Sequence, residues 1–141
     1  MNDAAALQKV REAAAALVAA FGEHRTDDYF ACFHPDATFV FYPVAERLES
    51  RAAFREDWER SMRESGFKVL ACTTSDQRIQ LFGEVAVLTH TVYTRQRAEE
   101  VEEDLVERET IVFQRQADGR WLAVHEHLSP APVDSDEVSE T

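Results

Sequence analysis

Two side chains in the second half of the chain, His90 and Glu126, have the chemistry of a general acid–base pair. An imidazole and a carboxyl group that share an apolar pocket can move a proton to and from a bound molecule. Each lies in a segment that alternates between apolar and polar residues, which is typical of a strand with one buried face. The face that these two side chains share therefore decides whether they can meet a ligand.

The residues that share a strand face with His90 and Glu126 indicate whether that face of the sheet points inward. They are Ala86, Leu88, Ile111, Phe113, Leu122, Val124 and Leu128. Because helices must cover the concave face of such a sheet, this more apolar set should point inward. We therefore expect His90 and Glu126 to be catalytic residues in an internal pocket. The alternative is that they pair with each other, or reach water, and do no chemistry.

Four further residues are expected to contact a ligand in that pocket. Tyr42 can donate a hydrogen bond from its hydroxyl group, and Trp58 can form a flat wall, with core packing as the alternative role of Trp58. Phe113 and Leu128 belong to the inward set. The expected partner is an apolar or aromatic small molecule.

The opposite face of the sheet should carry Arg108, Trp121, His125 and His127. This row is too apolar for open solvent and too polar for a core, so we expect a homodimer interface there. A β-bulge would turn the same row inward and make it the site instead. Two His residues at i and i+2 of a strand can share a metal, but the sequence supplies no third ligand. We expect no metal and no cofactor.

Composition narrows the class of protein. With 141 residues, 45% of them hydrophobic, the chain is expected to form one domain over residues 1–132, followed by a disordered acidic tail at 133–141. Its 15 basic and 27 acidic residues give a net charge of −12, which disfavours nucleic acid as a partner. No apolar run approaches the ~20 residues that cross a membrane. Cys32 and Cys72 lie in apolar contexts and suggest buried thiols in a cytoplasmic protein.

The elements that must position these residues follow from periodicity, capping residues and turn residues. Helices are expected at Ala4–Phe21, from Thr26 to about Phe33, and from the cap Ser50 to about Ser65; strands are expected at Ala37–Tyr42, Lys68–Phe82, Val85–Ala98, Leu105–Gln116 and Trp121–Leu128, with the acidic block 99–104 as a connection. Helices that precede consecutive antiparallel strands indicate an α+β fold. Strands this long must bend, so a strongly curled antiparallel sheet should wrap around the N-terminal helices.

Several segments resemble a known superfamily. They are Asp36-Ala37-Thr38, the run Glu46–Arg51 with Trp58, Gly83-Glu84-Val85-Ala86, and above all Glu109-Thr110 followed by Asp118-Gly119-Arg120-Trp121 and Val124–Ser129. Over about residues 4–130 the chain is similar to the SnoaL-like branch of the nuclear-transport-factor-2-like superfamily, and to the association domain of calmodulin-dependent kinase II. The resemblance implies a conical α+β fold with an internal pocket, dimerising through its convex face. It implies no single reaction, because this fold hosts isomerases, cyclases, dehydratases and assembly hubs.

The departures from these relatives bear on function. Ketosteroid-isomerase-like members carry a catalytic Asp just before the Pro that closes the first strand, and Tyr42 stands there in this chain. The pocket arginines of the kinase domains fall on Val92, Ile111 and Leu128. We expect a small-molecule-binding domain that acts as a cofactor-independent isomerase, cyclase or dehydratase. The alternative is a non-catalytic ligand-sensing or oligomerisation module with a vestigial pocket.

Overall fold

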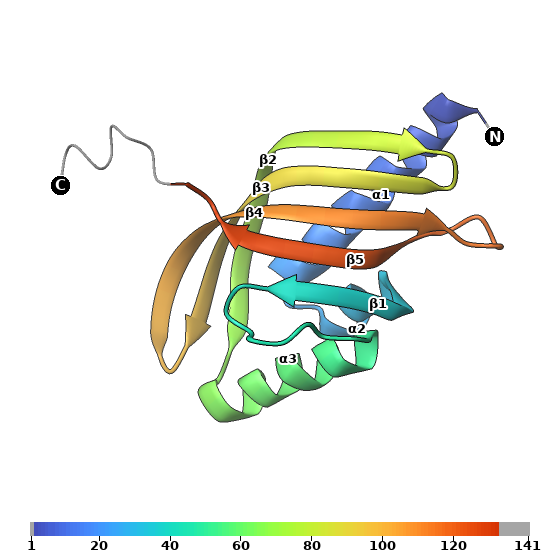
Figure 1. Cartoon of the computed structure of the whole chain (residues 1–141). Helices are drawn as coiled ribbons and strands as arrows, with labels where there is room; N and C mark the ends of the chain where they lie inside the picture. Colours follow the sequence, from blue (N-terminus) through green and yellow to red (C-terminus); the bar gives the residue numbers. More distant parts are fainter. Residues whose placement is uncertain (1, 133–141) are drawn as a thin grey trace.

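Residues 2–132, which a computed structural model describes, form helices α1 to α3 and a five-stranded sheet (Figure 1). The predicted acidic tail lies outside the described residues. The elements in chain order are α1 (Asp3–Gly22), α2 (Thr26–Ala31), β1 (Phe33–Phe41), α3 (Arg51–Ser65), β2 (Lys68–Phe82), β3 (Val85–Ala98), β4 (Val101–Arg115) and β5 (Trp121–Pro130). None of the described helices is both long and apolar enough to cross a membrane.

The sheet confirms the α+β prediction. Its strand order is β1-β5-β4-β3-β2, and β2 to β5 form the expected antiparallel meander. The first strand corrects the expectation of a wholly antiparallel sheet, because β1 pairs with β5 in parallel. A parallel pair needs a crossover rather than a hairpin, and here α3 and the meander supply it.

Helices α1 and α3 start and end close to where the sequence indicates. Helix α2 ends at Ala31, and β1 begins at Phe33 rather than at the expected Ala37. Ser50 accepts a hydrogen bond from the amide of Ala53 at 3.0 Å, and Gly66 ends α3 in the left-handed conformation at φ +66°. The end of α1 lies very close to β2: a Cβ atom on Gly22 would sit 3.1 Å from the Cβ atom of Cys72. The chain can make this close approach because position 22 has no side chain.

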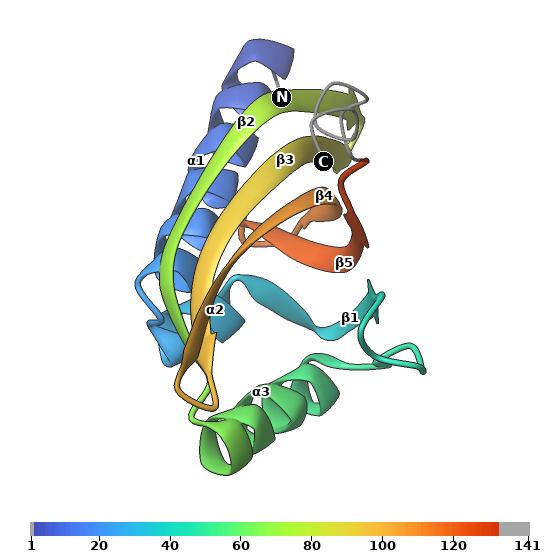
Figure 2. The ribbon, with the colours of Figure 1, turned by 90° about the vertical axis from the view of Figure 1, so that its left-hand side faces the viewer.

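The long strands curl, as Figure 2 shows, with α1 along β2 on one side and α3 at the end of the curl. Strand β2 has two irregularities in its pairing, between Val69 and Ala71 and between Ser75 and Arg78. Such interruptions bend a strand and increase its twist. The curl leaves the concave face of β3, β4 and β5 open toward the helices.

The acidic block is mostly strand, which corrects its assignment as a connection. Only Glu99 and Glu100 form the turn, and both have positive φ, at 53° and 65°. Strand β4 already begins at Val101, and Arg95 on β3 contacts Glu102 and Asp104 at 3.1 Å. Cross-strand ion pairs therefore balance part of the acidic charge.

A β-bulge near the start of β5 reverses the faces expected there. Val112 pairs with His125, whereas Phe113 pairs with Ala123, so Val124 has no partner on β4. An extra residue on one strand shifts every side chain before it to the opposite face.

The bulge overturns the expected exposure of Trp121. Its side chain is 5% exposed and packs in the core with Ala123, while Leu122 and Val124 are only half-buried. Trp121 therefore does not lie in the outer row. Beyond the bulge the expected order holds, and Glu126 points inward.

Candidate functional site

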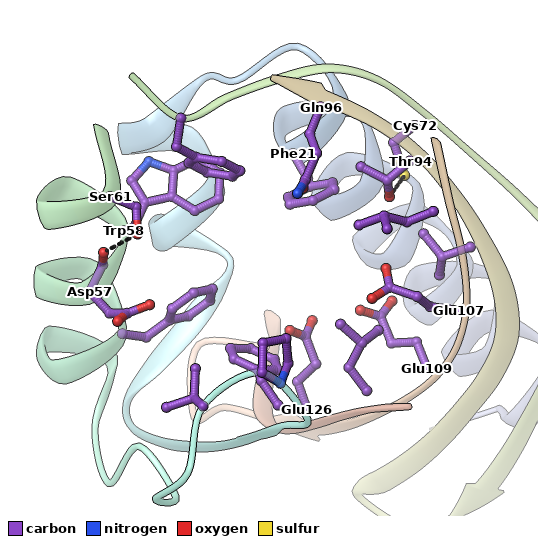
Figure 3. Close-up of a pocket in the computed structure, with 18 of the residues that line it drawn as sticks. Phe21, Asp57, Trp58, Ser61, Cys72, Thr94, Gln96, Glu107, Glu109 and Glu126 are labelled. Carbon is purple, nitrogen blue, oxygen red and sulfur yellow. Dashed lines mark hydrogen bonds between the residues drawn. The ribbon is translucent and has the colours of Figure 1, made fainter. Parts of the chain in front are cut away.

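A cavity of about 340 Å³ lies between α3, the end of α1 and the concave face of the sheet (Figure 3). Its volume is in the range of small-molecule sites, roughly 300–1,000 Å³. Most of its lining side chains are apolar or aromatic, among them Leu17, Phe21, Tyr29, Phe41, Phe54, Trp58, Phe67, Val92 and Leu128. The site therefore favours a ligand with a large apolar surface.

Three carboxyl groups enter this apolar cavity from two adjacent strands. Glu107 and Glu109 come from β4 and Glu126 from β5, and Figure 3 shows all three pointing into the cavity. Glu126 pairs with Ile111 across the strands, so Glu109 is its diagonal neighbour on the same face. Glu126 is 2% exposed and Glu107 is 6% exposed. Buried carboxyl groups in such a setting are candidates for acid–base chemistry.

His90 contacts Glu109 rather than Glu126, which corrects the expected pair. The two residues face each other on β3 and β4, and Nε2 of His90 lies 2.6 Å from Oε1 of Glu109. His90 is fully buried behind Glu109, outside the cavity lining. Its Nδ1 atom has no partner among residues 2–132. An Nε2–H group of His90 can donate to the Glu109 carboxyl group and orient it.

Glu126 is the acid of the carboxyl pair. Burial raises the pKa of Glu126 well above its ordinary value, and the neighbouring charge of Glu109 and a hydrogen bond with it act in the same direction. Oε1 of Glu126 is buried and receives no hydrogen bond from any described residue. The cavity thus places Glu126, a carboxyl group whose proton is held tightly, beside Glu109, which a histidine orients.

Tyr42 and Glu107 form a second contact at the edge of the cavity. The Tyr42 hydroxyl donates to Oε2 of Glu107 at 2.6 Å, and the Tyr42 side chain is 47% exposed. Burial and this hydrogen bond raise the pKa of Tyr42 to about 12, so it stays a phenol and a donor. Burial also raises the pKa of Glu107, which the hydrogen bond from Tyr42 opposes.

Three of the four predicted ligand contacts, Tyr42, Trp58 and Leu128, line the cavity, and Phe113 does not. Phe113 is buried in the core, deeper along β4 than the cavity reaches. Trp58 is held in place because its Nε1 atom donates to Oγ1 of Thr26 at 3.1 Å and its ring stacks on His24. The tryptophan therefore forms a fixed wall.

The remaining predicted residues, Arg108, His125 and His127, lie on the outer face of the sheet, away from the cavity. The Nδ1 atom of His125 is hydrogen-bonded to Oγ1 of Thr38 on β1 at 2.8 Å. Within residues 2–132 no three His, Cys, Asp or Glu side chains are grouped to hold a metal ion.

Sequence reasoning missed Glu107 and Glu109. A signal was present, because these residues stand four and two positions before Ile111 and share its face. Their acidic neighbours concealed it: the block 99–104 suggested a solvated connection, although the strand continues inward past it.

The helices packed on a curled sheet give the chain a nuclear transport factor 2-like fold. Within that class the chain belongs to the SnoaL-like domain family, whose model matches residues 10–134. No curated protein sequence matches it significantly.

Solved structures agree with this assignment. A nuclear transport factor 2-like superfamily protein from Salmonella enterica serovar Typhimurium superposes with a TM-score of 0.77 at 17% identity, over 96% of this chain and 99% of that chain. A ketosteroid isomerase-like protein from Erwinia carotovora atroseptica gives 0.75 at 16% identity, over 90% and 97%. A Streptomyces avermitilis protein of the nuclear transport factor 2-like family, proposed to be a dehydratase, gives 0.73 at 17% identity, over 94% and 100%.

At these identities the likeness shows the fold alone. None of these three proteins is a kinase association domain, so that part of the resemblance stays a prediction.

Proposed function

We propose that this SnoaL-like domain is a cofactor-independent acid–base enzyme that isomerises, cyclises or dehydrates an apolar or aromatic small molecule. The observation that supports it is the pair of carboxyl groups, Glu109 and Glu126, inside an apolar cavity. Two carboxyl groups whose surroundings separate their protonation states can serve as base and acid in one site.

The proposed chemistry divides the work between the two groups. The ionised Glu109 removes a proton from a carbon next to a carbonyl group, and the protonated Glu126 supplies a proton or hydrogen bond to the oxygen where negative charge develops. Returning the proton to another carbon completes an isomerisation; protonating a departing hydroxyl group completes a dehydration. His90 is a positioning residue, because it reaches the substrate only through Glu109.

Hydrogen–deuterium exchange tests this proposal without knowledge of the natural substrate. A panel of apolar and aromatic ketones is incubated with the protein in D₂O, and exchange next to the carbonyl group is followed by NMR. We expect exchange with at least one ketone, and a loss of roughly 100-fold or more in the Glu109→Gln variant. Glu56→Gln, on the exposed side of α3, is the charge-matched control and should keep the wild-type rate. Equal rates in wild type and Glu109→Gln would contradict the proposal.

One observation favours a second candidate, a non-catalytic ligand sensor or oligomerisation module. Tyr42 occupies the position before Pro43 where ketosteroid-isomerase-like relatives carry a catalytic Asp, and its pKa of about 12 rules it out as a resting base. A ligand that raises the melting temperature of the domain but undergoes no exchange or conversion would support this role.

A further inference from the structure

The third carboxyl group of the cavity, Glu107, has no part in the proposed reaction. Its Oε2 atom accepts from Tyr42, and the side chain is 6% exposed, yet no Lys, Arg or His of residues 2–132 forms an ion pair with it. Buried carboxylates are normally paired with a positive charge, because removing a lone charge from water is costly.

The charge inside the cavity is one-sided. Asp57, Glu107, Glu109 and Glu126 line it, and none of its lining residues is Lys or Arg. Asp57 has an external partner, since Nη2 of Arg60 lies 3.0 Å from its Oδ1 atom. Among the described residues, Glu109 contacts His90, whereas Glu107 and Glu126 form no ion pair with Lys, Arg or His. An anionic ligand would be repelled from this site.

An unpartnered oxygen of Glu126 is a second observation, and it does not depend on how many acidic residues line the cavity. Glu126 lines the cavity, and its Oε1 atom is buried and receives no hydrogen bond from residues 2–132. A buried acceptor of this kind requires a donor, and the ligand is the group that can bring one.

The wall opposite the carboxyl groups is aromatic. Phe21, Tyr29 and Trp58 lie with ring centroids 5.2–6.0 Å apart, and Figure 3 places Trp58 across the cavity from Glu107. Aromatic faces attract organic cations, and most strongly where water is excluded.

From the uncompensated Glu107, the unpartnered oxygen of Glu126 and the aromatic wall, we infer that the ligand is an aromatic or apolar molecule that carries a protonated amine. The ammonium group lies beside Glu107, with the carboxyl groups of Glu109 and Glu126 next along the same wall, and the apolar body lies against Trp58. The inference rests on the proposed function only in placing the substrate in the same cavity. It names the substrate class and excludes aromatic acids.

Isothermal titration calorimetry with three indoles of similar shape tests the inference. Tryptamine carries a positive charge, tryptophol is neutral and indole-3-propionate is negative. We expect tryptamine to bind at least tenfold more tightly than tryptophol, and indole-3-propionate to show no binding. Glu107→Gln should weaken tryptamine about tenfold and leave tryptophol unchanged, which also reports that the variant pocket is intact. The charge-matched Glu56→Gln should change neither affinity.

The outcomes separate this inference from the proposed function. Equal affinities for tryptamine and tryptophol, absence of tryptamine binding, or full tryptamine affinity in Glu107→Gln would each overturn it. Deuterium exchange into ketones is measured independently, so acid–base activity could still be found after any of these results. If Glu109→Gln loses deuterium exchange while tryptamine and tryptophol bind equally well, the protein is an acid–base enzyme that acts on neutral substrates.

Discussion

The Nε2 atom of His90 lies 2.6 Å from Oε1 of Glu109, and this contact with a buried histidine orients the Glu109 carboxyl group. The residues face each other across β3 and β4, so sheet register alone brings them together. The contact gives the carboxylate a defined direction toward the cavity.

Removing this donor should reduce turnover more than binding. In His90→Phe we expect the exchange kcat to fall at least tenfold with KM little changed, because Glu109 would keep its place but lose its orientation. The free energy of unfolding should fall by about 1–3 kcal/mol, since the buried carboxylate loses a partner. His90→Gln, whose amide can donate, should recover part of kcat. The double variant His90→Phe/Glu109→Gln should be no slower than Glu109→Gln, and additive losses would show that His90 acts separately.

Glu126→Gln should stabilise the protein at neutral and higher pH. The native pKa of Glu126 is raised by burial and by Glu109, so native protein holds a proton that the unfolded chain releases above a pH of about 4.5. The contribution of Glu126 to the free energy of unfolding of the wild type is therefore fully present below that pH. It is lost as the pH rises toward the native pKa. Glu107 and Glu109 face Glu126 across the cavity edge, and His90 lies behind Glu109.

Calorimetric melting temperatures of wild type and Glu126→Gln across pH 4–8 measure this difference. The variant should melt higher at the alkaline end, and the gap should close toward the acidic end. A gap that widened on acidification would mean that Glu126 is a stabilised carboxylate in the native state.

The β3–β4 turn should accept a stabilising replacement. Glu99 and Glu100 both adopt the left-handed conformation, which is costly for residues with a Cβ atom. Asn-Gly suits a two-residue hairpin turn of this shape. Glu99→Asn/Glu100→Gly should raise the free energy of unfolding by about 1 kcal/mol, measured by urea denaturation. Glu99→Gln/Glu100→Gln is the control for lost charge, and equal gains in both variants would assign the effect to repulsion instead.

Homodimer formation through the convex face stays a prediction. Tyr93 and Val106 pair across β3 and β4, and their side chains are 43% and 48% exposed beside the row that includes His127. Light scattering at micromolar concentration should give twice the chain mass of 16.1 kDa. Tyr93→Lys should shift the mass to the monomer without lowering the helix or strand content. A wild-type monomer would contradict the prediction.

The sequence by itself determined most of the elements and the burial of His90 and Glu126. Capping residues such as Ser50 and Gly66 act on their own helix, and alternation along a strand is a property of adjacent residues, so both can be found without knowing what lies across the sheet. The same rule, continued back from Ile111, would have found Glu107 and Glu109.

Only the tertiary structure decided which side chains meet. His90 contacts Glu109 because β3 and β4 pair in one register, and Trp121 is buried because β5 takes in an extra residue at Val124. Register and bulges depend on how two strands pack against the same helices. Since no single segment contains that information, the carboxyl pair, its histidine and the aromatic wall opposite become one site only in the folded chain.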